Sequence, residues 1–272
     1  MTRGVIYLLS GSTYAELLCT SLYTLRQHWT GPVTIFATDE PSTKISERIG
    51  HDPQLNADVR PAELAQVRRR QSYCTKPSLP PLSPYDQTVY LDCDTLVVAP
   101  IDELFEHPLT LTQFSNWTTT GGRIVSGRLK QWRGLGPATE ALVNEALASP
   151  QPAVNTGIFG FHRDHPILPA WQTLTLAGAR CSFTDELAMQ LLAPHADTRI
   201  LSDEWNLSPL YGKNRDEVRI HHLHGRAHVR KRQGRAIWRP FFDEAREAKA
   251  GQMDQWGGTF DKAVKVDQHA AT

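Results

Sequence analysis

The hydrophobic positions of the first forty residues form short continuous runs separated by a segment of helical period. Residues 5–9 are an unbroken apolar run, which is typical of a strand covered on both faces. Apolar side chains then recur at helical spacing from Tyr14 to Trp29, and a second apolar run follows at 33–37. This order predicts a strand–helix–strand unit of a parallel α/β sheet.

The pattern continues with further expected elements, although the second half of the chain is less regular. Residues 115–136 contain glycine, threonine and tryptophan and predict a long loop or an irregular hairpin. The other expected elements are a helix after 40, a strand near 57–59, an arginine-rich helix before 71, strands ending at 91, 161 and 201, and helices at 137–148, 164–177 and 184–193. We therefore expect one α/β domain over residues 1–242, with a Rossmann-like, mostly parallel sheet flanked by helices, and a weakly ordered tail over 243–272.

The composition is that of an ordinary globular protein. The 272 residues carry 29 basic and 29 acidic side chains, so no global charge favours nucleic acid or an acidic membrane surface. No apolar run approaches the roughly 18 residues of a transmembrane helix, and the chain opens on a strand without signal-peptide features, so we expect a cytoplasmic protein. The four cysteines have no CxxC spacing, which indicates neither a zinc site nor a disulfide framework.

The most informative stretch is 88–98, where a strand leads into Asp92 and Asp94 and a second apolar run follows at once. A buried strand cannot hold two unpaired carboxylates, because each would cost several kcal/mol, so we expect both on an exposed turn at the end of the strand. Two hard oxygen ligands close together suit Mg²⁺ or Mn²⁺. The alternative is a turn that is merely acidic, since aspartate is common in turns.

Polar groups recur where the first strands end. Ser10 follows the first strand, Asp39 follows the second, and the aspartate pair follows a later one. Because ligands of α/β sheets bind at the carboxyl ends of strands, these groups are expected to share one cleft. The first turn has neither the glycine-rich dinucleotide fingerprint nor a P-loop, which argues against a hydride-transfer enzyme or a P-loop kinase.

A histidine cluster and a basic segment stand near the C-terminus. Residues 220–225 read IHHLHG, and an imidazole can complete a metal site that two carboxylates begin. The alternative is that these histidines only cap a loop. The surrounding segment 219–239 carries seven lysine or arginine residues and no acidic residue. This pattern fits a diphosphate clamp, a nucleic-acid contact or a solvated basic loop.

Two further polar groups have both a functional and a structural interpretation. Asn155 interrupts an apolar strand, where its amide could bind a sugar hydroxyl or simply sit in a β-bulge. Asp185 and Glu186 open a helix, where acidic residues also complement the helix dipole.

Together these motifs resemble the GT-A-type nucleotide-sugar glycosyltransferases, and most closely glycosyltransferase family 8, which contains glycogenin and bacterial galactosyltransferases. The resemblance covers roughly residues 4–230. It is carried by the opening strand–helix–strand and by the segments SPYDQTVYLDCDTLV, NTGIFGF, TDELAMQLL and HLHG.

The resemblance implies roles for particular residues. Asp92 and Asp94, a DxD motif, would bind Mn²⁺ or Mg²⁺ together with His222, for which His224 is the competing choice. Asn155 would contact the donor sugar, and Asp185 and Glu186 would orient its hydroxyls, which makes these three the expected catalytic residues. The expected donor-binding residues are Ser10, Asp39, Lys76, Asp92, Cys93, Gly225 and Arg226. The lysine of the family's Lys-Pro-Trp falls here on His228, so Arg226, Arg230 or Lys231 would replace it.

The resemblance implies metal-dependent transfer of a hexose from a nucleoside-diphosphate sugar, with a UDP-sugar favoured, to an acceptor hydroxyl, with retention of configuration. The acceptor stays open: a glycan, a protein, a small molecule or a modified base in nucleic acid. The rival readings are a sugar-phosphate nucleotidyltransferase, a metal-dependent hydrolase, and a non-enzymatic nucleic-acid-binding module built on 68–70 and the basic segment.

Overall fold

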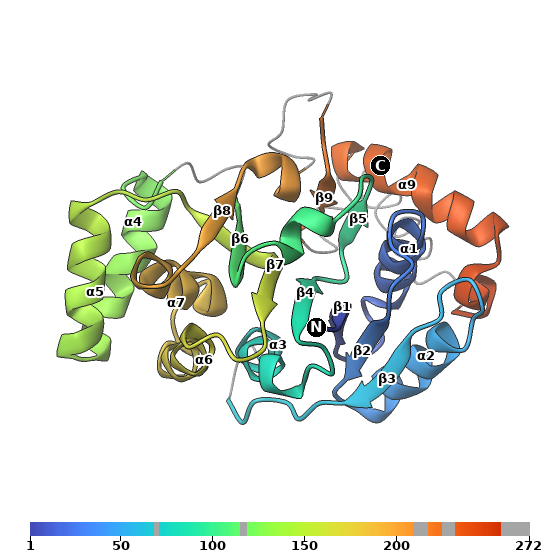
Figure 1. Cartoon of the computed structure of the whole chain (residues 1–272), viewed down its shortest axis with the longest axis horizontal. Helices are drawn as coiled ribbons and strands as arrows, with labels where there is room; N and C mark the ends of the chain where they lie inside the picture. The colour runs from blue at the N-terminus through green and yellow to red at the C-terminus, as the bar shows by residue number, and fades with distance from the viewer. Residues whose placement is uncertain (68–70, 115–118, 209–216, 225–231, 257–272) are drawn as a thin grey trace, which may run out of the picture.

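A seven-stranded sheet forms the centre of the molecule (Figure 1). The computed structural model of the chain describes residues 1–67, 71–114, 119–208, 217–224 and 232–256. The strand order is β3-β2-β1-β4-β7-β6-β8, and only β7 runs antiparallel to its neighbours. The strands are β1 (Arg3–Leu9), β2 (Val33–Ala37), β3 (Asp58–Pro61), β4 (Gln87–Leu91), β6 (Leu109–Gln113), β7 (Val154–His162) and β8 (Arg199–Leu201). The expected mostly parallel α/β sheet is thus confirmed.

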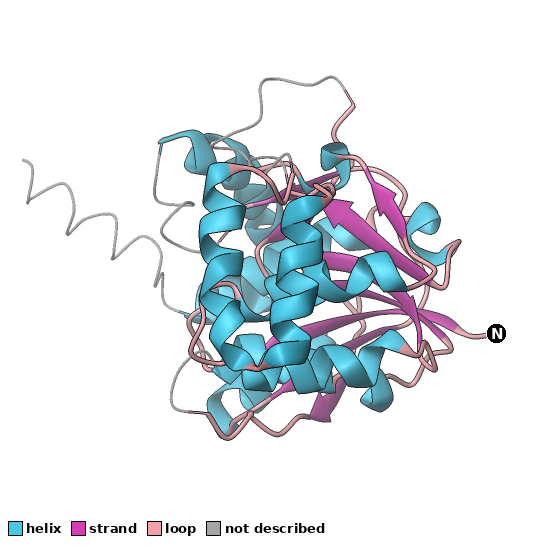
Figure 2. Cartoon of the chain, turned by 90° about the vertical axis from the view of Figure 1, so that its left-hand side faces the viewer, coloured by secondary structure: helices cyan, strands magenta, loops and turns pink. Residues whose placement is uncertain are grey.

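Helices cover both faces of this sheet, and each face has its own apolar core. In β1, Val5, Tyr7 and Leu9 face one side, whereas Ile6 and Leu8 face the other, as the two-residue period of a strand requires. The first face packs against α1 (Ala15–Arg26), α2 (Glu40–Gly50) and α9 (Arg232–Glu247). The second packs against α4 (Arg123–Leu129), α5 (Pro137–Ala148), α6 (Ile167–Ala177) and α7 (Thr184–Leu192), behind which the strands pass in Figure 2.

A second, two-stranded sheet joins distant parts of the chain above the carboxyl end of β4. It pairs β5 (Thr95–Val97) with β9 (Ile220–His222) in antiparallel register, with Thr95 opposite His222. The turn between β4 and β5 carries the aspartate pair. The short sheet therefore places a histidine from late in the sequence directly beside these carboxylates.

Two expectations from the sequence need correction. Residues 123–129 form α4 and 130–135 a 3₁₀ helix, although glycine-rich 115–136 predicted a loop or hairpin. The glycines stand at helix ends and on exposed positions, while Val125, Leu129 and Trp132 are buried, so burial of an apolar face overrides the local preference. The arginine-rich helix expected before residue 71 is not formed over 62–67, which are irregular, and 68–70 lie outside the described residues.

The C-terminal segment packs on the first face. Helix α9 crosses the boundary expected after residue 242, and Ala245, Ala250 and Met253 are buried in the core that α1 shares. The thiol of Cys19 in α1 donates a hydrogen bond to the carbonyl of Ala250. Within the described parts of the chain, no helix has the length and apolar character needed to cross a membrane.

Candidate functional site

The aspartate pair sits on the turn that follows β4. The Asp92 amide donates to the Gly157 carbonyl of β7 at 2.7 Å, and the hydroxyl of Thr95 donates to the Asp92 carbonyl at 2.9 Å, so both ends of the turn are fixed. We expected an exposed turn, but Asp94 is only 6% exposed. The turn lines a cleft instead, which means that these carboxylates lie in a partly water-excluded setting.

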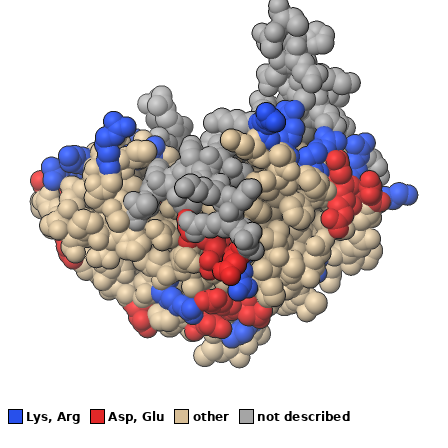
Figure 3. Space-filling model, turned by 90° about the horizontal axis from the view of Figure 1, so that it is seen from above, with Lys and Arg blue, Asp and Glu red and all other residues tan. Residues whose placement is uncertain are grey.

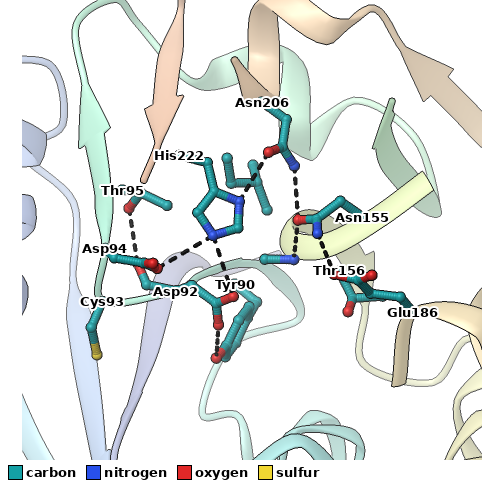
Figure 4. A network of polar contacts seen from close by, with 12 residues as sticks. Tyr90, Asp92, Cys93, Asp94, Thr95, Asn155, Thr156, Glu186, Asn206 and His222 are labelled. Carbon is teal, nitrogen blue, oxygen red and sulfur yellow. Dashed lines mark hydrogen bonds and ion pairs between the residues drawn. The ribbon is translucent and has the colours of Figure 1, made fainter. Parts of the chain in front are cut away.

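His222 closes the group from the opposite strand of the small sheet (Figure 4). Its Nε2 lies 3.3 Å from Asp94 Oδ1 and 3.6 Å from Asp92 Oδ2. One ligand atom from each of the three residues falls within 4.8 Å of the other two. The carboxylates and the imidazole thus converge on one point, as the resemblance to family 8 implied.

Asn206, at the end of a 3₁₀ helix over Asp203–Asn206, sets the tautomer of this imidazole. The amide nitrogen of Asn206 donates to Thr112 Oγ1 at 2.8 Å and to Asn155 Oδ1 at 3.0 Å. Its oxygen is therefore the atom that lies 2.9 Å from His222 Nδ1, and Nδ1 must carry the proton. The lone pair of neutral His222 is then on Nε2, facing two carboxylates.

This arrangement suits a bound cation. A lone pair and two carboxylates repel one another unless a proton or a metal ion stands between them. Carboxylate oxygens suit Mg²⁺ and Mn²⁺, and an imidazole whose other nitrogen is hydrogen-bonded is a common metal ligand. Three ligands from one side leave the remaining positions for water and substrate. Asp92, Asp94 and His222 therefore fit a divalent ion.

His224, the competing choice, has a different place. It also lines the cleft, but its ring lies tilted by 37° against that of His222, with centroids 4.0 Å apart, and makes an edge contact with Phe114 at 4.7 Å. Its backbone is left-handed, with φ of 52°. The three-residue group that could hold a metal ion among the described residues includes His222 and not His224.

Lys76 links the aspartate turn to the start of α7. Its ammonium is buried and lies 3.1 Å from Asp92 Oδ1, 3.0 Å from Asp185 Oδ2 and 3.3 Å from the Thr156 carbonyl. Burial alone would lower the pKa of Lys76, but the charges of Asp185 and Asp92 outweigh it and raise the pKa. All three of its N–H groups thus have a protein acceptor, so Lys76 braces the site in this structure.

A bulge in β7 supplies the polar centre of the site. Leu111 of β6 pairs with Phe159, whereas the next residue, Thr112, pairs with Asn155, so the intervening residues of β7 arch out of the ladder. Asn155 Oδ1 accepts the Gly157 amide at 2.8 Å within this arch. Both interpretations of Asn155 therefore apply, because the bulge is what aims its side chain.

Asp185 and Glu186 reach the same place from the first turn of α7. Thr156 Oγ1 donates to Asp185 Oδ2 at 2.8 Å, and the amide nitrogen of Asn155 donates to Glu186 Oε1. The second oxygens, Asp185 Oδ1 and Glu186 Oε2, are buried without a hydrogen-bond partner among the described residues. Two carboxyl groups are therefore held on one side while their other oxygens stay available to a ligand.

Glu186 is expected to make stability depend on pH. Burial, and next the charge of Asp185, raises the pKa of Glu186 from 4.5 to about 8. Because the pKa is higher in the folded protein, protonated Glu186 makes its full contribution to the free energy of unfolding below about pH 4.5. This contribution is lost as the pH rises through about 8. Glu186→Gln removes this loss, so urea unfolding should show the variant gaining on the wild type between pH 5 and pH 9. Glu63→Gln, at an exposed position, is the control, and parallel profiles for wild type and Glu186→Gln would contradict the assignment.

Position 157 has room only for glycine, because the side chains of His222 and Asp92 pack directly against its backbone. A Cβ at this position would stand 2.2 Å from His222 Cε1 and 2.7 Å from Asp92 Oδ2. We expect Gly157→Ala to weaken Mn²⁺ binding by about 10–100-fold, as loss of ligand alignment does elsewhere, with unchanged far-UV circular dichroism. Gly127→Ala, where a Cβ meets nothing within 4 Å, should bind as the wild type does. Equal calorimetric affinities for the two variants would contradict this prediction.

The cleft that these groups line has a volume of about 920 Å³. Of the residues expected from the sequence, Ser10, Lys76, Asp92, Cys93, Asp94, Asp185, Glu186 and His222 line it. Asn155 is not among the lining residues and reaches the site through its hydrogen bond to Glu186. Asp39 instead caps α2, accepting the Ser42 amide and, at 2.8 Å, the Gly11 amide of the loop that carries Ser10. Gly225, Arg226 and the other basic candidates at 228–231 lie outside the described residues.

Two residues of the site escaped the sequence reasoning. Tyr90 donates its hydroxyl to Asp92 Oδ1 at 2.7 Å, and the two-residue period of β4 places both on one face, so this partner could have been found. Asn206 has no such signal, because it reaches His222 and Asn155 only through tertiary packing. Both residues orient the carboxylate and the imidazole of the site, and Tyr90 also lines the cleft.

Similarity to known proteins is detectable only at the level of structure. No protein-family model matches the chain, and no curated protein matches it in sequence. The structure of the glycosyltransferase GlyE from Streptococcus pneumoniae TIGR4 superposes with a TM-score of 0.60 at 13% identity, covering 93% of this chain and 64% of that one. An active-site mutant of LgtC superposes at 0.59 and 14% identity, covering 90% and 95%.

Both similar proteins are GT-A-type glycosyltransferases. The chain has the GT-A fold. Its span of 64% of the GlyE chain means that GlyE contains further residues that have no counterpart here. The GT-A fold places the aspartate turn and His222 at the carboxyl end of the parallel strands, which is where open α/β sheets bind their ligands.

Proposed function

We propose that this protein is a metal-dependent glycosyltransferase that moves a hexose from a nucleoside-diphosphate sugar, with a UDP-sugar favoured, to an acceptor hydroxyl. The observation that carries the proposal is the convergence of Asp92, Asp94 and His222 at the edge of a cleft, with His222 held in the tautomer that presents a lone pair. The GT-A fold supports it, because the two similar structures belong to glycosyltransferases.

The donor's diphosphate would lie beside the aspartate turn. A Mn²⁺ or Mg²⁺ ion held by the two aspartates and His222 would supply Lewis acidity and neutralise charge on the departing diphosphate. Tyr90 and Lys76 hold Asp92 in place from the side away from His222. The protein thus contributes a preformed, oriented set of ligands that needs little rearrangement on binding.

The hexose would contact the carboxyl groups at the start of α7. Asp185 and Glu186 each have one oxygen bound within the protein and one buried oxygen without a hydrogen-bond partner among the described residues, which suits acceptance of sugar hydroxyls. Asn155 fixes Glu186 and the arch of β7 together. We therefore assign these three residues to orientation of the donor sugar.

Retention is proposed to proceed by attack on the face that the diphosphate leaves. Asp185 is the rival for a covalent role, but it is 1% exposed and its Oδ2 is bound by Lys76 and Thr156. A carboxylate neutralised in this way is a weak nucleophile. We therefore assign to the departing phosphate the role of base, which takes the proton of the acceptor hydroxyl as that hydroxyl bonds to the anomeric carbon.

A nucleic-acid-binding function has less support. Formal net charge is zero, and on the face seen in Figure 3 acidic and basic side chains of the described residues are interspersed. Residues 68–70 and 225–231, which motivated that reading, lie outside the described part of the chain. Metal-independent binding that falls steeply with salt would favour it over the enzyme.

A panel of sugar nucleotides tests the proposal. UDP-glucose, UDP-galactose, GDP-mannose and dTDP-glucose are incubated with Mn²⁺, with Mg²⁺ or with EDTA, and the released nucleotide is identified. We expect nucleoside diphosphate from a UDP-sugar in Mn²⁺ and none in EDTA. Release of nucleoside monophosphate and sugar phosphate would identify a hydrolase of the diphosphate bond instead. Absence of any cleavage by protein that binds Mn²⁺ would contradict the proposal.

A further inference from the structure

Two aromatic side chains stand exposed at the mouth of the cleft. Phe183 is 36% exposed and Tyr73 is 52% exposed, and both line the cleft that contains Asp185 and Glu186. The remaining exposed large hydrophobic residues among those described, such as Leu82, Ile124 and Leu176, do not line it. Exposed aromatic surface next to convergent polar groups is typical of a ligand-binding groove.

The backbone at Phe183 is unusual for its residue type. Phe183 adopts left-handed dihedral angles of 54° and 54°, which favour glycine or asparagine and cost a bulky residue free energy. It stands directly before the first turn of α7, where its carbonyl accepts the Leu187 amide at 2.8 Å. A bulky aromatic residue held in this conformation at a cleft points to a function for its ring.

Arg128 of α4 holds the ring of Phe183 from one side. The guanidinium carbon lies 3.5 Å from the ring centroid, which is stacking distance for a cation–π contact. The ring is therefore fixed in orientation although it is exposed. Its position in the sequence, two residues before Asp185, places the apolar surface beside the proposed sugar-orienting carboxyls.

Tyr73 approaches from the other wall. It belongs to α3 (Gln71–Thr75), which packs against α7. Its side chain lines the cleft, and burial, followed by the charges of Asp92 and Asp185, raises the pKa of Tyr73. Tyr73 thus adds a second aromatic side chain, half of it exposed, to the mouth of the cleft.

We propose that Phe183 and Tyr73 form the acceptor subsite and that the acceptor is a saccharide, one of whose rings lies against Phe183. The inference rests on the proposed glycosyl transfer and names its acceptor class. A sugar ring combines an apolar C–H face, which stacks on an aromatic ring, with hydroxyls that the neighbouring carboxyls can accept. The aromatic ring of Phe183 and the carboxyl groups of Asp185 and Glu186 line the same cleft and offer both kinds of contact.

The charge of the cleft disfavours the other acceptor classes. Among the described residues that line it, four are acidic, and Lys76 is the only lysine or arginine. The ammonium of Lys76 is already bound to Asp92 and Asp185. A nucleic-acid acceptor would bring more negative charge to this wall and be repelled. A neutral saccharide meets no such penalty.

Transfer to a panel of acceptors tests the subsite. Glucose, galactose, N-acetylglucosamine, lactose and maltose are compared with a serine- and tyrosine-containing peptide and a DNA duplex, each with the donor that the enzyme cleaves. We expect transfer to at least one saccharide. Phe183→Ala should raise the KM for that saccharide about tenfold and shift the donor from transfer towards hydrolysis, whereas Phe183→Tyr should restore the KM. Leu176→Ala, which removes an exposed leucine outside the cleft, is the matched control.

A second variant separates binding from folding. Phe183→Asn suits the left-handed backbone, so its melting temperature should equal or exceed that of the wild type while the acceptor KM rises as in Phe183→Ala. Preference for peptide or duplex, no transfer to any saccharide, or a saccharide KM indifferent to Phe183 would each overturn the inference. Since water also accepts the hexose, continued donor cleavage in those cases leaves the proposed transferase chemistry standing. If the wild type cleaved no donor at all, the proposed glycosyltransferase function itself would be contradicted.

Discussion

Replacing Asp94 with asparagine should abolish Mn²⁺-dependent release of nucleoside diphosphate while the protein stays folded. Asp94 is buried next to Asp92 and His222, so the change removes one ligand and one negative charge from a crowded group. We expect a loss of activity of about a thousandfold or more, in line with several kcal/mol of Lewis-acid stabilisation. Without metal, the lower charge repulsion should keep the melting temperature at or above that of the wild type.

Calorimetry with and without Mn²⁺ gives the second half of this test. The ion should raise the melting temperature of the wild type in proportion to its binding, and it should leave Asp94→Asn unchanged. Asp164→Asn, on an exposed loop at the opposite edge of the sheet, should respond to Mn²⁺ as the wild type does. A wild-type-sized Mn²⁺ response from Asp94→Asn would mean that Asp94 is not a ligand.

Lys76→Met is expected to have the largest effect on stability. Its ammonium is buried between Asp92 and Asp185, and no other lysine or arginine is recorded within salt-bridge distance of these carboxylates among the described residues. Methionine fills the volume but leaves two carboxylates uncompensated, which should lower the free energy of unfolding by about 3–5 kcal/mol. Chemical denaturation at neutral pH measures this loss directly.

A double-mutant cycle tests the cause of that loss. Adding Asp185→Asn to Lys76→Met should recover part of the stability, because one of the two orphaned charges disappears. Lys130→Met, at an exposed position, should change the free energy of unfolding by less than about 0.5 kcal/mol. Additive effects of the two substitutions at 76 and 185 would show that Lys76 acts through packing rather than charge.

The sequence predicted those parts of the fold that have a strong local pattern. The apolar runs of β1 and β2 and the helical period of α1 are confirmed, because both faces of the sheet must be covered at these positions. Helix α4 was missed because Gly121, Gly122 and Gly127 favour a loop locally, whereas burial of Val125 and Leu129 stabilises the helix. Helix α9 was hidden by its basic residues and by Pro240, although Trp238 and Phe242 bury one face of it.

The candidate site divides in the same way. The aspartate pair could be identified because carboxylates at a strand end are a local signal. The choice of His222 within its histidine cluster came from the resemblance to glycosyltransferase family 8, and the pairing of β5 with β9 brings it beside the aspartates. The hydrogen bond from Asn206 and the role of Lys76 as a brace depend on contacts between elements far apart in the chain. No local pattern records such contacts.

The small two-stranded sheet links the proposed metal site to completed folding. His222 arrives on β9, whereas both aspartates belong to the turn before β5, so high-affinity binding becomes possible only once these distant segments have paired. A bound ion would link β5 to β9, and local opening of this strand pair would set the rate at which the ion leaves. Substitutions that speed amide exchange in β5 and β9 should therefore also speed release of the metal.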